Sequence, residues 1–83
     1  MYQVLIENRA EKEIESLPDE VLKRSLSAIS SLKQNPRPHG VKKLLVEDGW
    51  RIRIGDYRIL YTIDDKQGLV KIYRVKHRKD VYR

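Results

Sequence analysis

The spacing of apolar residues changes at Gly40, and this change limits the kinds of fold that the chain can adopt. Before Gly40, apolar residues recur every three or four positions, as in Leu22, Leu26 and Ile29, which is the spacing of a buried helix face. After Gly40 they alternate with polar residues, most clearly over residues 50–54, which is typical of a half-buried strand. The chain therefore combines a helical half with a half made of strands.

The elements are expected in the order β-α-α-β-β-β-β. A short strand is predicted at residues 2–6, followed by a helix opened by a capping box of Asn8 and Glu11. A second helix is predicted from about Asp19 to about Lys33. Further strands are predicted at residues 41–46, 50–54, 57–63 and 69–75, after a proline-containing loop at 35–40. This order predicts an α+β fold, with a helical hairpin packed on one face of a mostly antiparallel sheet.

Composition narrows the class of protein. The 83 residues suit a single domain, residues 1–83, with one modest core. The chain has no cysteine, which excludes a disulfide scaffold and a thiol nucleophile. It has no apolar run near the roughly 20 residues of a membrane span and no signal-peptide core, so we expect a cytoplasmic protein without a membrane partner.

The net charge of +6 lies entirely in the second half of the chain. Residues 1–40 hold six basic and six acidic side chains, whereas residues 41–83 hold twelve basic and six acidic ones. A neutral half joined to a basic half indicates a scaffold with one anion-binding surface. Nucleic acid is the first candidate for the partner, ahead of an acidic protein or a membrane surface.

The hairpin around Gly55-Asp56 predicts where this positive charge lies. A two-residue turn pairs Ile54 with Tyr57 and Arg53 with Arg58. Trp50 and the isoleucines then share an apolar face for the helices to cover, and Arg51, Arg53 and Arg58 share the opposite face. Like charges directly opposite each other are destabilising, which indicates a bound anion, although solvated arginines on an open sheet face would give the same pattern.

The end of the chain adds a second group of candidates. Residues 75–83 contain four cations, His77 and Tyr82. His77 is a candidate proton donor or acceptor because its ordinary pKa lies near 7, and Tyr82 is a candidate for stacking on a base. The chain has no glycine-rich phosphate loop and no second histidine at metal-ligand spacing, and Asp64-Asp65 is typical of a turn. We therefore expect neither a metal nor a cofactor.

Two segments, residues 50–61 and residues 75–82, resemble the RelE/ParE superfamily of toxin–antitoxin toxins, and in particular its RelE-like branch. The resemblance extends over nearly the whole chain, including the loop that ends at Gly40. It implies the RelE-like microbial RNase fold and a metal-independent endoribonuclease that cuts mRNA in the ribosomal A site. It also implies a cognate RelB-like antitoxin, with the ribosome and mRNA as the other partners.

The resemblance also implies roles for individual residues. The expected catalytic residues are Arg51, Arg53, Arg58, His77, Arg78 and Tyr82. The basic residues expected to bind RNA are Lys42, Lys43, Lys76, Lys79 and Arg83. The arginines would orient the scissile phosphate and stabilise its charge while the RNA 2′-hydroxyl attacks. The other interpretations are a ParE-like poison of DNA gyrase and a non-catalytic module that binds RNA or the antitoxin.

Overall fold

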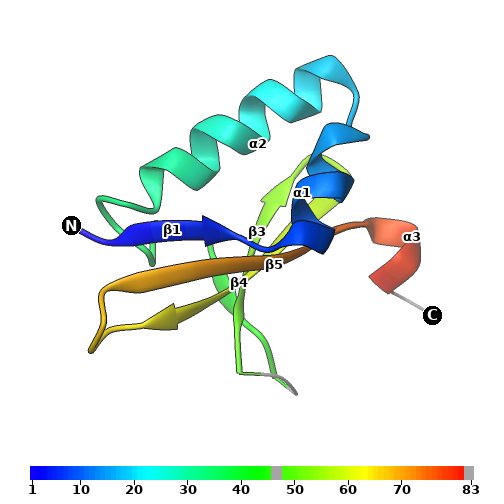
Figure 1. Ribbon diagram of the computed structural model, residues 1–83. Helices are drawn as coiled ribbons and strands as arrows, with labels where there is room; N and C mark the ends of the chain where they lie inside the picture. Colours follow the sequence, from blue (N-terminus) through cyan, green and yellow to red (C-terminus); the bar gives the residue numbers. More distant parts are fainter. Residues whose placement is uncertain (46–47, 82–83) are drawn as a thin grey trace.

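A layer of two helices lies on one face of a five-stranded sheet (Figure 1). The computed structural model describes residues 1–45 and 48–81. The helices of the hairpin are α1 (Asn8–Glu15) and α2 (Asp19–Ser31), and a short third helix, α3 (Arg78–Val81), ends the described chain. The strands are β1 (Gln3–Ile6), β2 (Lys42–Lys43), β3 (Trp50–Ile54), β4 (Tyr57–Asp64) and β5 (Leu69–His77). The α+β class and the helical hairpin are confirmed.

The core lies between the helices and the sheet. Ile14 of α1 and Ile29 of α2 meet the inward side chains of the central strands, among which Ile59, Tyr61 and Ile72 are fully buried. The period-2 pattern of β3 and β4 places their apolar residues on this inner face. Burial of this apolar surface is the main source of stability for so small a chain.

The predicted register of the hairpin is confirmed. β3 and β4 pair Ile54 with Tyr57 and Arg53 with Arg58. Gly55 has a φ of 57°, whereas Asp56 does not have a positive φ, as the predicted type II′ turn requires. The strand order is β1-β5-β4-β3-β2, and β1 runs parallel to β5 while the other pairs are antiparallel.

Several local predictions were wrong. Asn8 does not cap α1, because the Glu7 amide still donates to the Ile72 carbonyl and the chain stays extended up to Glu7, which becomes the N-cap without a side-chain cap. β2 has two residues in place of the predicted strand at 41–46, since regular pairing stops at Lys43; residue 46 lies outside the described chain. Leu26 is 47% exposed although its spacing predicted burial.

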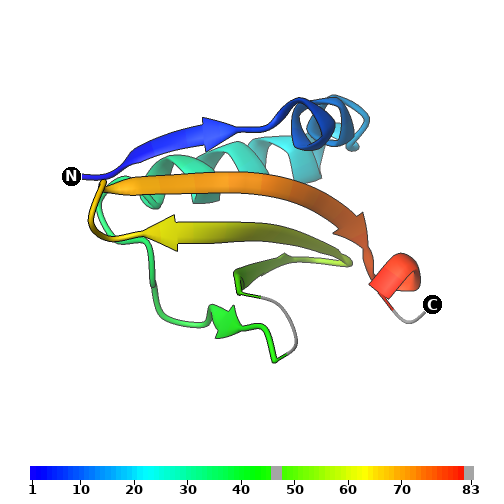
Figure 2. The ribbon, with the colours of Figure 1, turned by 60° about the horizontal axis from the view of Figure 1, so that its bottom comes forward.

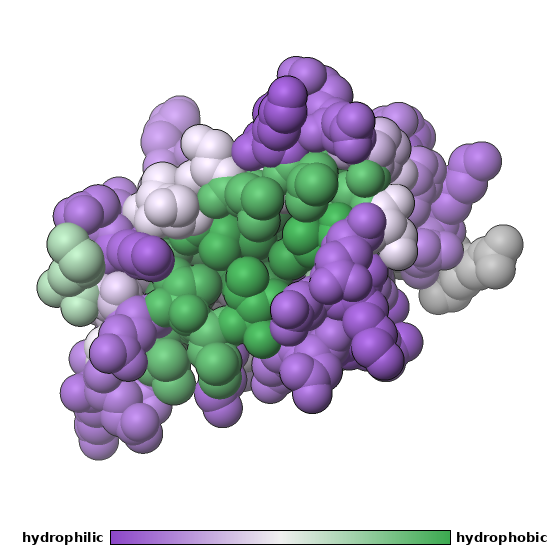
Figure 3. Space-filling view, turned by 45° about the horizontal axis from the view of Figure 1, so that its top comes forward, coloured by the Kyte–Doolittle hydropathy of each residue, from purple (hydrophilic) through white to green (hydrophobic). Residues whose placement is uncertain are grey.

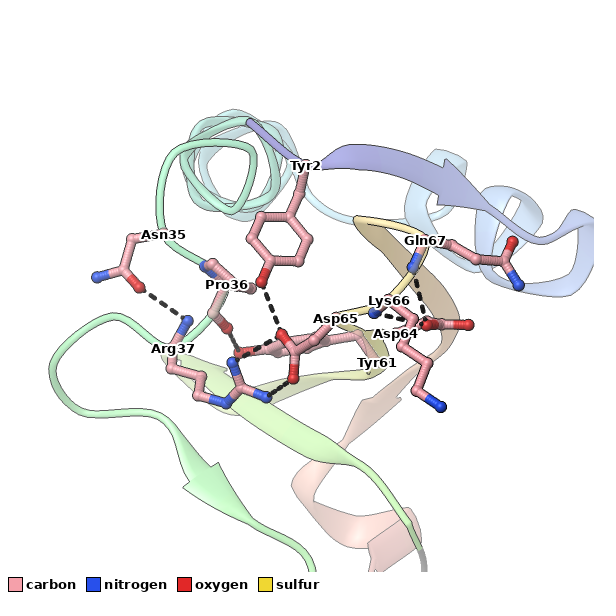
Figure 4. A network of polar contacts seen from close by, with 9 residues as sticks. All are labelled: Tyr2, Asn35, Pro36, Arg37, Tyr61, Asp64, Asp65, Lys66 and Gln67. Carbon is pink, nitrogen blue, oxygen red and sulfur yellow. Dashed lines mark hydrogen bonds and ion pairs between the residues drawn. The ribbon is translucent and has the colours of Figure 1, made fainter.

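A polar network connects the segments at the end of the sheet that lies opposite the hairpin turn (Figure 4). Asp65, in the β4–β5 turn, accepts two hydrogen bonds from Arg37, with Nη–Oδ distances of 3.2 and 2.9 Å, and one from the Tyr2 hydroxyl at 2.6 Å. The buried Tyr61 hydroxyl donates to the Pro36 carbonyl at 2.8 Å. Asp64 accepts from the backbone amides of residues 66 and 67, which is the turn role expected for it. The network joins β1, the 35–38 loop and the β4–β5 turn.

The network changes the acid–base behaviour of its members. Hydrogen bonds from Arg37 and then Tyr2 lower the pKa of Asp65, and the hydrogen bond to Asp65 raises the pKa of Tyr2. Burial raises the pKa of Tyr61 to about 12. Because the pKa of the Asp65 carboxyl lies below its ordinary value, Asp65 links the stability of this end of the sheet to acidic pH.

The lowered pKa of Asp65 predicts an acid-dependent contribution to stability. The ionised carboxylate stabilises the folded chain above its ordinary pKa of 3.8, and this contribution is lost as the pH falls through the lower folded-state pKa. Asp65→Asn should therefore lower the Tm at pH 7 and leave it unchanged at a pH below the folded-state pKa, measured by circular dichroism. The control is Asp48→Asn, because Asp48 is exposed and has no ion pair among the described residues. An equal Tm difference at all pH values would contradict the prediction.

Candidate functional site

The helices leave one face of the sheet uncovered (Figure 2), and the strand register places a group of basic side chains on that face. The register places Arg53, Arg58 and Lys76 side by side on three neighbouring strands, and Lys42 beside Arg51 in the next row. We call this group the arginine face; its members are Lys42, Arg51, Arg53, Arg58 and Lys76. Alternation along the strands turns these side chains away from the core, so the structure brings the three predicted strand arginines to one surface.

Arg58 is the unusual member of the arginine face. Its side chain is only 4% exposed, although no helix covers this side of the sheet. Its Nε and Nη1 atoms are buried and have no hydrogen-bond acceptor among the described residues. A buried cation without a partner is strongly unfavourable. An anion that displaced the side chains covering these atoms would supply the missing acceptors, and a guanidinium group matches the oxygens of a phosphate.

The carboxylates that form ion pairs within the described residues do so away from the arginine face. Glu13 of α1 binds Arg74, with an Nη2–Oε2 distance of 3.1 Å, and also accepts from the Val75 amide at 2.8 Å. Asp56 in the hairpin turn lies 3.9 Å from Arg78. Within residues 1–45 and 48–81, no carboxylate lies within 4.0 Å of a basic group of the arginine face. The charge of this surface is therefore left for a ligand.

Arg78 and His77 are placed differently from the strand arginines. The Arg78 amide donates to the Asp56 carbonyl at 2.6 Å, so α3 begins beside the hairpin turn. His77 pairs in register with Tyr57, and the two rings meet edge to face at 5.0 Å. His77 thus lies on the Tyr57 side of the sheet and not beside Arg58. Its Nδ1 atom accepts from the Lys79 amide at 3.2 Å.

The remaining predicted residues divide between the two faces. Lys76 lies on the arginine face next to Arg58. Lys43 lies on the other face, with its Nζ 5.5 Å from the centre of the Trp50 ring. Lys79 is exposed in α3. Tyr82 and Arg83 lie outside the described residues, so their predicted roles are neither supported nor contradicted by position.

Trp50 was predicted to belong to the core, and it lies at the edge of it. The ring is partly buried against the core, and the Arg37 guanidinium carbon also lies over it, 5.3 Å from its centre. The cationic groups of Arg37 and Lys43 are attracted to the quadrupole of the Trp50 ring.

The described residues contain no cluster of three or more acidic or histidine side chains that could hold a metal. No helix among them is long and apolar enough to cross a membrane.

A second surface, on the helix side, was not predicted. An apolar patch runs across this side of the molecule and is bordered by polar residues (Figure 3). It coincides with a groove of about 610 Å³ between β1, α1 and α2. Its lining residues are Val4, Leu5, Ile6, Glu11, Ile14, Glu15, Leu22 and Leu26. Leu5 is 50% and Leu26 47% exposed, and β1 is an outer strand of the sheet, so this apolar groove adjoins an unpaired strand edge.

The unpartnered cation predicts a stability difference between two arginines. Arg58→Met should raise the free energy of unfolding by about 1 kcal/mol or more, because it removes a buried charge that lacks a partner. The matched control is Arg53→Met, because Arg53 is the cross-strand partner of Arg58 and is exposed. Its free energy of unfolding should stay within about 0.5 kcal/mol of the wild-type value. Urea denaturation measures both values. A clear loss of stability in Arg58→Met would show that Arg58 has a partner in the free protein.

The chain is similar to known toxins over almost its whole length. The family profile of the ParE toxin of type II toxin–antitoxin system, parDE, matches residues 4–82. Toxin RelG of Mycobacterium tuberculosis is 36% identical, over 99% of this chain and 97% of RelG.

Two solved structures have the same fold. In the crystal structure of the archaeal RelE–RelB complex from Pyrococcus horikoshii, the matched chain is 34% identical, with a TM-score of 0.84 over 93% of this chain and 94% of that one. In the toxin–antitoxin complex RelBE2 from M. tuberculosis, the matched chain is 32% identical. Its TM-score is 0.79, over 92% of this chain and 96% of that one. The chain belongs to the RelE/ParE superfamily, and it is a toxin of a type II toxin–antitoxin system.

Proposed function

We propose that this toxin is a ribosome-dependent endoribonuclease that cleaves mRNA in the A site and so arrests translation in the cytoplasm. The observation that carries the proposal is Arg58, a buried guanidinium whose Nε and Nη1 lack acceptors among the described residues. It lies between Arg53 and Lys76 on the basic face of the sheet, and a ligand would have to displace the side chains that cover it. A backbone phosphate of RNA supplies the oxygens that this group lacks.

The arginines support a reaction in which the RNA provides its own nucleophile. The 2′-hydroxyl oxygen forms a bond to the adjacent phosphorus as the bond from phosphorus to the 5′-oxygen breaks, which leaves a cyclic phosphate and a 5′-hydroxyl. One proton leaves the 2′-hydroxyl and one is gained by the 5′-oxygen. Arg51, Arg53 and Arg58 would align the phosphate and stabilise the extra negative charge of the transition state. This chemistry needs no metal.

Dependence on the ribosome follows from the lack of a suitable base. Arginine and lysine side chains are protonated at neutral pH, so the members of the arginine face are poor proton acceptors. A site of this kind gains most from a substrate that is already bent for in-line attack, which the ribosomal A site could provide. Lys42 and Lys76 would add contacts to RNA phosphates, and Lys79 and Arg83 keep the RNA-binding role that the family resemblance implies.

The alternative function within the superfamily is that of a ParE-like poison of DNA gyrase. The matched family profile is that of ParE, whereas the relatives above 30% identity bear Rel names. A gyrase poison needs no buried guanidinium prepared for a phosphate, so the environment of Arg58 favours the nuclease. A non-catalytic RNA-binding module would share the arginine face, and only an assay of RNA ends separates it from the nuclease.

Cleavage should depend on Arg58 and not on His77. In a translating extract, the wild-type toxin should create new A-site RNA ends, detected by primer extension. Arg58→Ala should slow single-turnover cleavage by about 10²–10³-fold, the usual effect of removing one donor to a charged transition state. His77→Ala should change the rate less than threefold, because His77 lies on the Tyr57 side of the sheet.

Four outcomes would contradict this prediction. Translation arrest without new RNA ends would exclude the nuclease, and gyrase-linked DNA breaks would support the ParE-like function. A loss of 10² or more in His77→Ala would restore it as the acid–base residue. If Arg58→Ala weakens only binding, the guanidinium contributes uniform attraction and not transition-state stabilisation.

We also propose that a RelB-like antitoxin is the partner and that one of its segments occupies the apolar groove. The structures from P. horikoshii and M. tuberculosis are complexes of relatives with RelB-type chains. The groove offers exposed Leu5 and Leu26 to apolar side chains of such a segment. The unpaired edge of β1 offers backbone hydrogen bonds to an added strand.

A charged side chain in the apolar groove should weaken binding of the antitoxin to the toxin. Leu26→Glu places a charge in the groove and should weaken binding of the cognate antitoxin at least tenfold by calorimetry, with toxicity retained. Leu45→Glu is the control, because Leu45 is a fully exposed leucine away from the groove, with a relative exposure of 102%. Equal affinity of the two variants would show that the antitoxin binds elsewhere, for example over the arginine face.

A further inference from the structure

A cleft of about 360 Å³ lies beside the arginine face. It is formed by β4, β5 and the turn that leads from β1 into α1. Its lining residues are Glu7, Arg9, Leu60, Tyr73, Arg74 and Lys76, and we call it the Tyr73 cleft. Lys76 belongs to both surfaces, since it lies in register with Arg58. The volume falls within the range of about 300–1,000 Å³ typical of small-ligand pockets, so a single nucleotide base can enter it.

A β-bulge puts an aromatic ring on the floor of the cleft. Leu60 pairs with Arg74 while Tyr61 pairs with Ile72, so Tyr73 is the extra residue of β5. Bulges redirect a side chain in this way. A Cβ atom built on Gly49, just before β3, would lie 3.1 Å from the Tyr73 hydroxyl. The side chain of Tyr73 therefore reaches across β4 toward β3, over the same face as the arginines.

The floor is apolar in an otherwise basic surface. Leu60 lines the cleft next to Tyr73 and is 8% exposed, and its register partner on β3 is Arg51. An aromatic ring enclosed by cations is the usual composition of a single-stranded RNA site, where bases stack on rings and phosphates meet basic side chains. A protein segment would instead need a longer apolar surface, such as the groove on the helix side.

The walls of the cleft provide polar groups for the edge of a base. Arg74 is held by Glu13, whereas Glu7 and Arg9 are exposed and have no ion pair within the described parts of the chain. Arg9 is therefore available as a hydrogen-bond donor and Glu7 as an acceptor. Glu7 follows β1 directly and Arg9 lies in the first turn of α1. The Glu7 amide donates to the Ile72 carbonyl at 2.9 Å, which holds this segment beside β5.

We propose that the Tyr73 cleft binds one base of the RNA strand, next to the phosphate held by Arg58. The base stacks on Tyr73, Arg9 donates to its edge, and the sugar–phosphate chain crosses Lys76. The proposal rests on the proposed nuclease function, because it extends the RNA path from the arginine face. It makes Tyr73 and Arg9 residues that position the substrate, separate from the groups that act on the scissile phosphate.

The test uses a short fluorescein-labelled RNA that carries 2′-O-methyl groups and cannot be cut. A matched series places a single abasic site at each position in turn. Tyr73→Leu should weaken binding of the intact RNA at least fivefold by fluorescence anisotropy at low ionic strength, since stacking on an aromatic ring is lost. Tyr73→Phe keeps the ring and should stay within twofold. One abasic RNA of the series should bind wild type and Tyr73→Leu equally well.

Arg9→Ala provides a second test that does not depend on packing, because Arg9 is exposed. The substitution should weaken binding of the intact RNA about threefold or more. It should not change binding of the abasic RNA that wild type and Tyr73→Leu bind equally well. Arg24→Ala is the matched control, since Arg24 is an exposed arginine on α2, on the helix side. The proposal is overturned if the wild type does not bind the RNA at low ionic strength. It is also overturned if Tyr73→Leu and Arg9→Ala weaken every abasic RNA equally, or weaken none.

The two proposals can fail separately. Base-dependent RNA binding without new RNA ends in a translating extract would reject cleavage and keep the Tyr73 cleft. If new A-site ends form but binding does not depend on the position of the abasic site, the cleavage proposal stands and the proposal for the Tyr73 cleft is rejected.

Discussion

The arrangement of the arginine face depends on the two-residue turn at Gly55-Asp56. This turn fixes every pair between β3 and β4, from Ile54 with Tyr57 to Trp50 with Tyr61. A shift by one residue would turn the arginines toward the helices and the isoleucines toward water. Burial of Ile59 and Tyr61 in the core therefore holds Arg58 on the opposite side. The stability of the core and the position of the candidate site have the same origin.

The molecule places its stabilising polar contacts away from its cationic surface. Glu13 joins α1 to β5 through Arg74 and the Val75 amide, and Asp65 joins three segments at the far end of the sheet. Neither carboxylate reaches Arg58. Bringing one there would relieve the buried charge, but it would also neutralise the surface that attracts an anion. Unfavourable electrostatics at one place, offset by packing and ion pairs elsewhere, is typical of functional sites.

Local patterns predicted the parts of the structure that local rules control. The hairpin register, the positive φ of Gly55 and the common face of Arg51, Arg53 and Arg58 follow from period-2 alternation and turn chemistry. His77 was grouped with the arginines because it stands in the basic end of the chain and its ordinary pKa lies near 7. The sequence does not show the bulge at Tyr73, and one inserted residue reverses which side of the sheet the end of β5 presents. Leu26 was predicted to be buried because periodicity shows that a helix face is apolar but not what covers it. The burial of Arg58 depends on neighbouring strands that a single segment does not reveal.

The two main surfaces lie on opposite sides of the sheet, which constrains how a partner could control the toxin. A segment bound only in the apolar groove would leave the arginine face open on the other side. The molecule measures 33 × 27 × 25 Å along its principal axes, so an extended chain of about eight to ten residues, at roughly 3.3 Å each, spans its thickness.

An antitoxin with two linked segments could therefore hold the groove and also reach the arginines. Linking would raise the effective concentration of the second segment once the first is bound. Acidic side chains in that second segment would supply the acceptors that Arg58 lacks. Such a segment would satisfy the same guanidinium that we assign to the phosphate, so inhibitor and substrate would compete for it even though their main contacts lie on different faces.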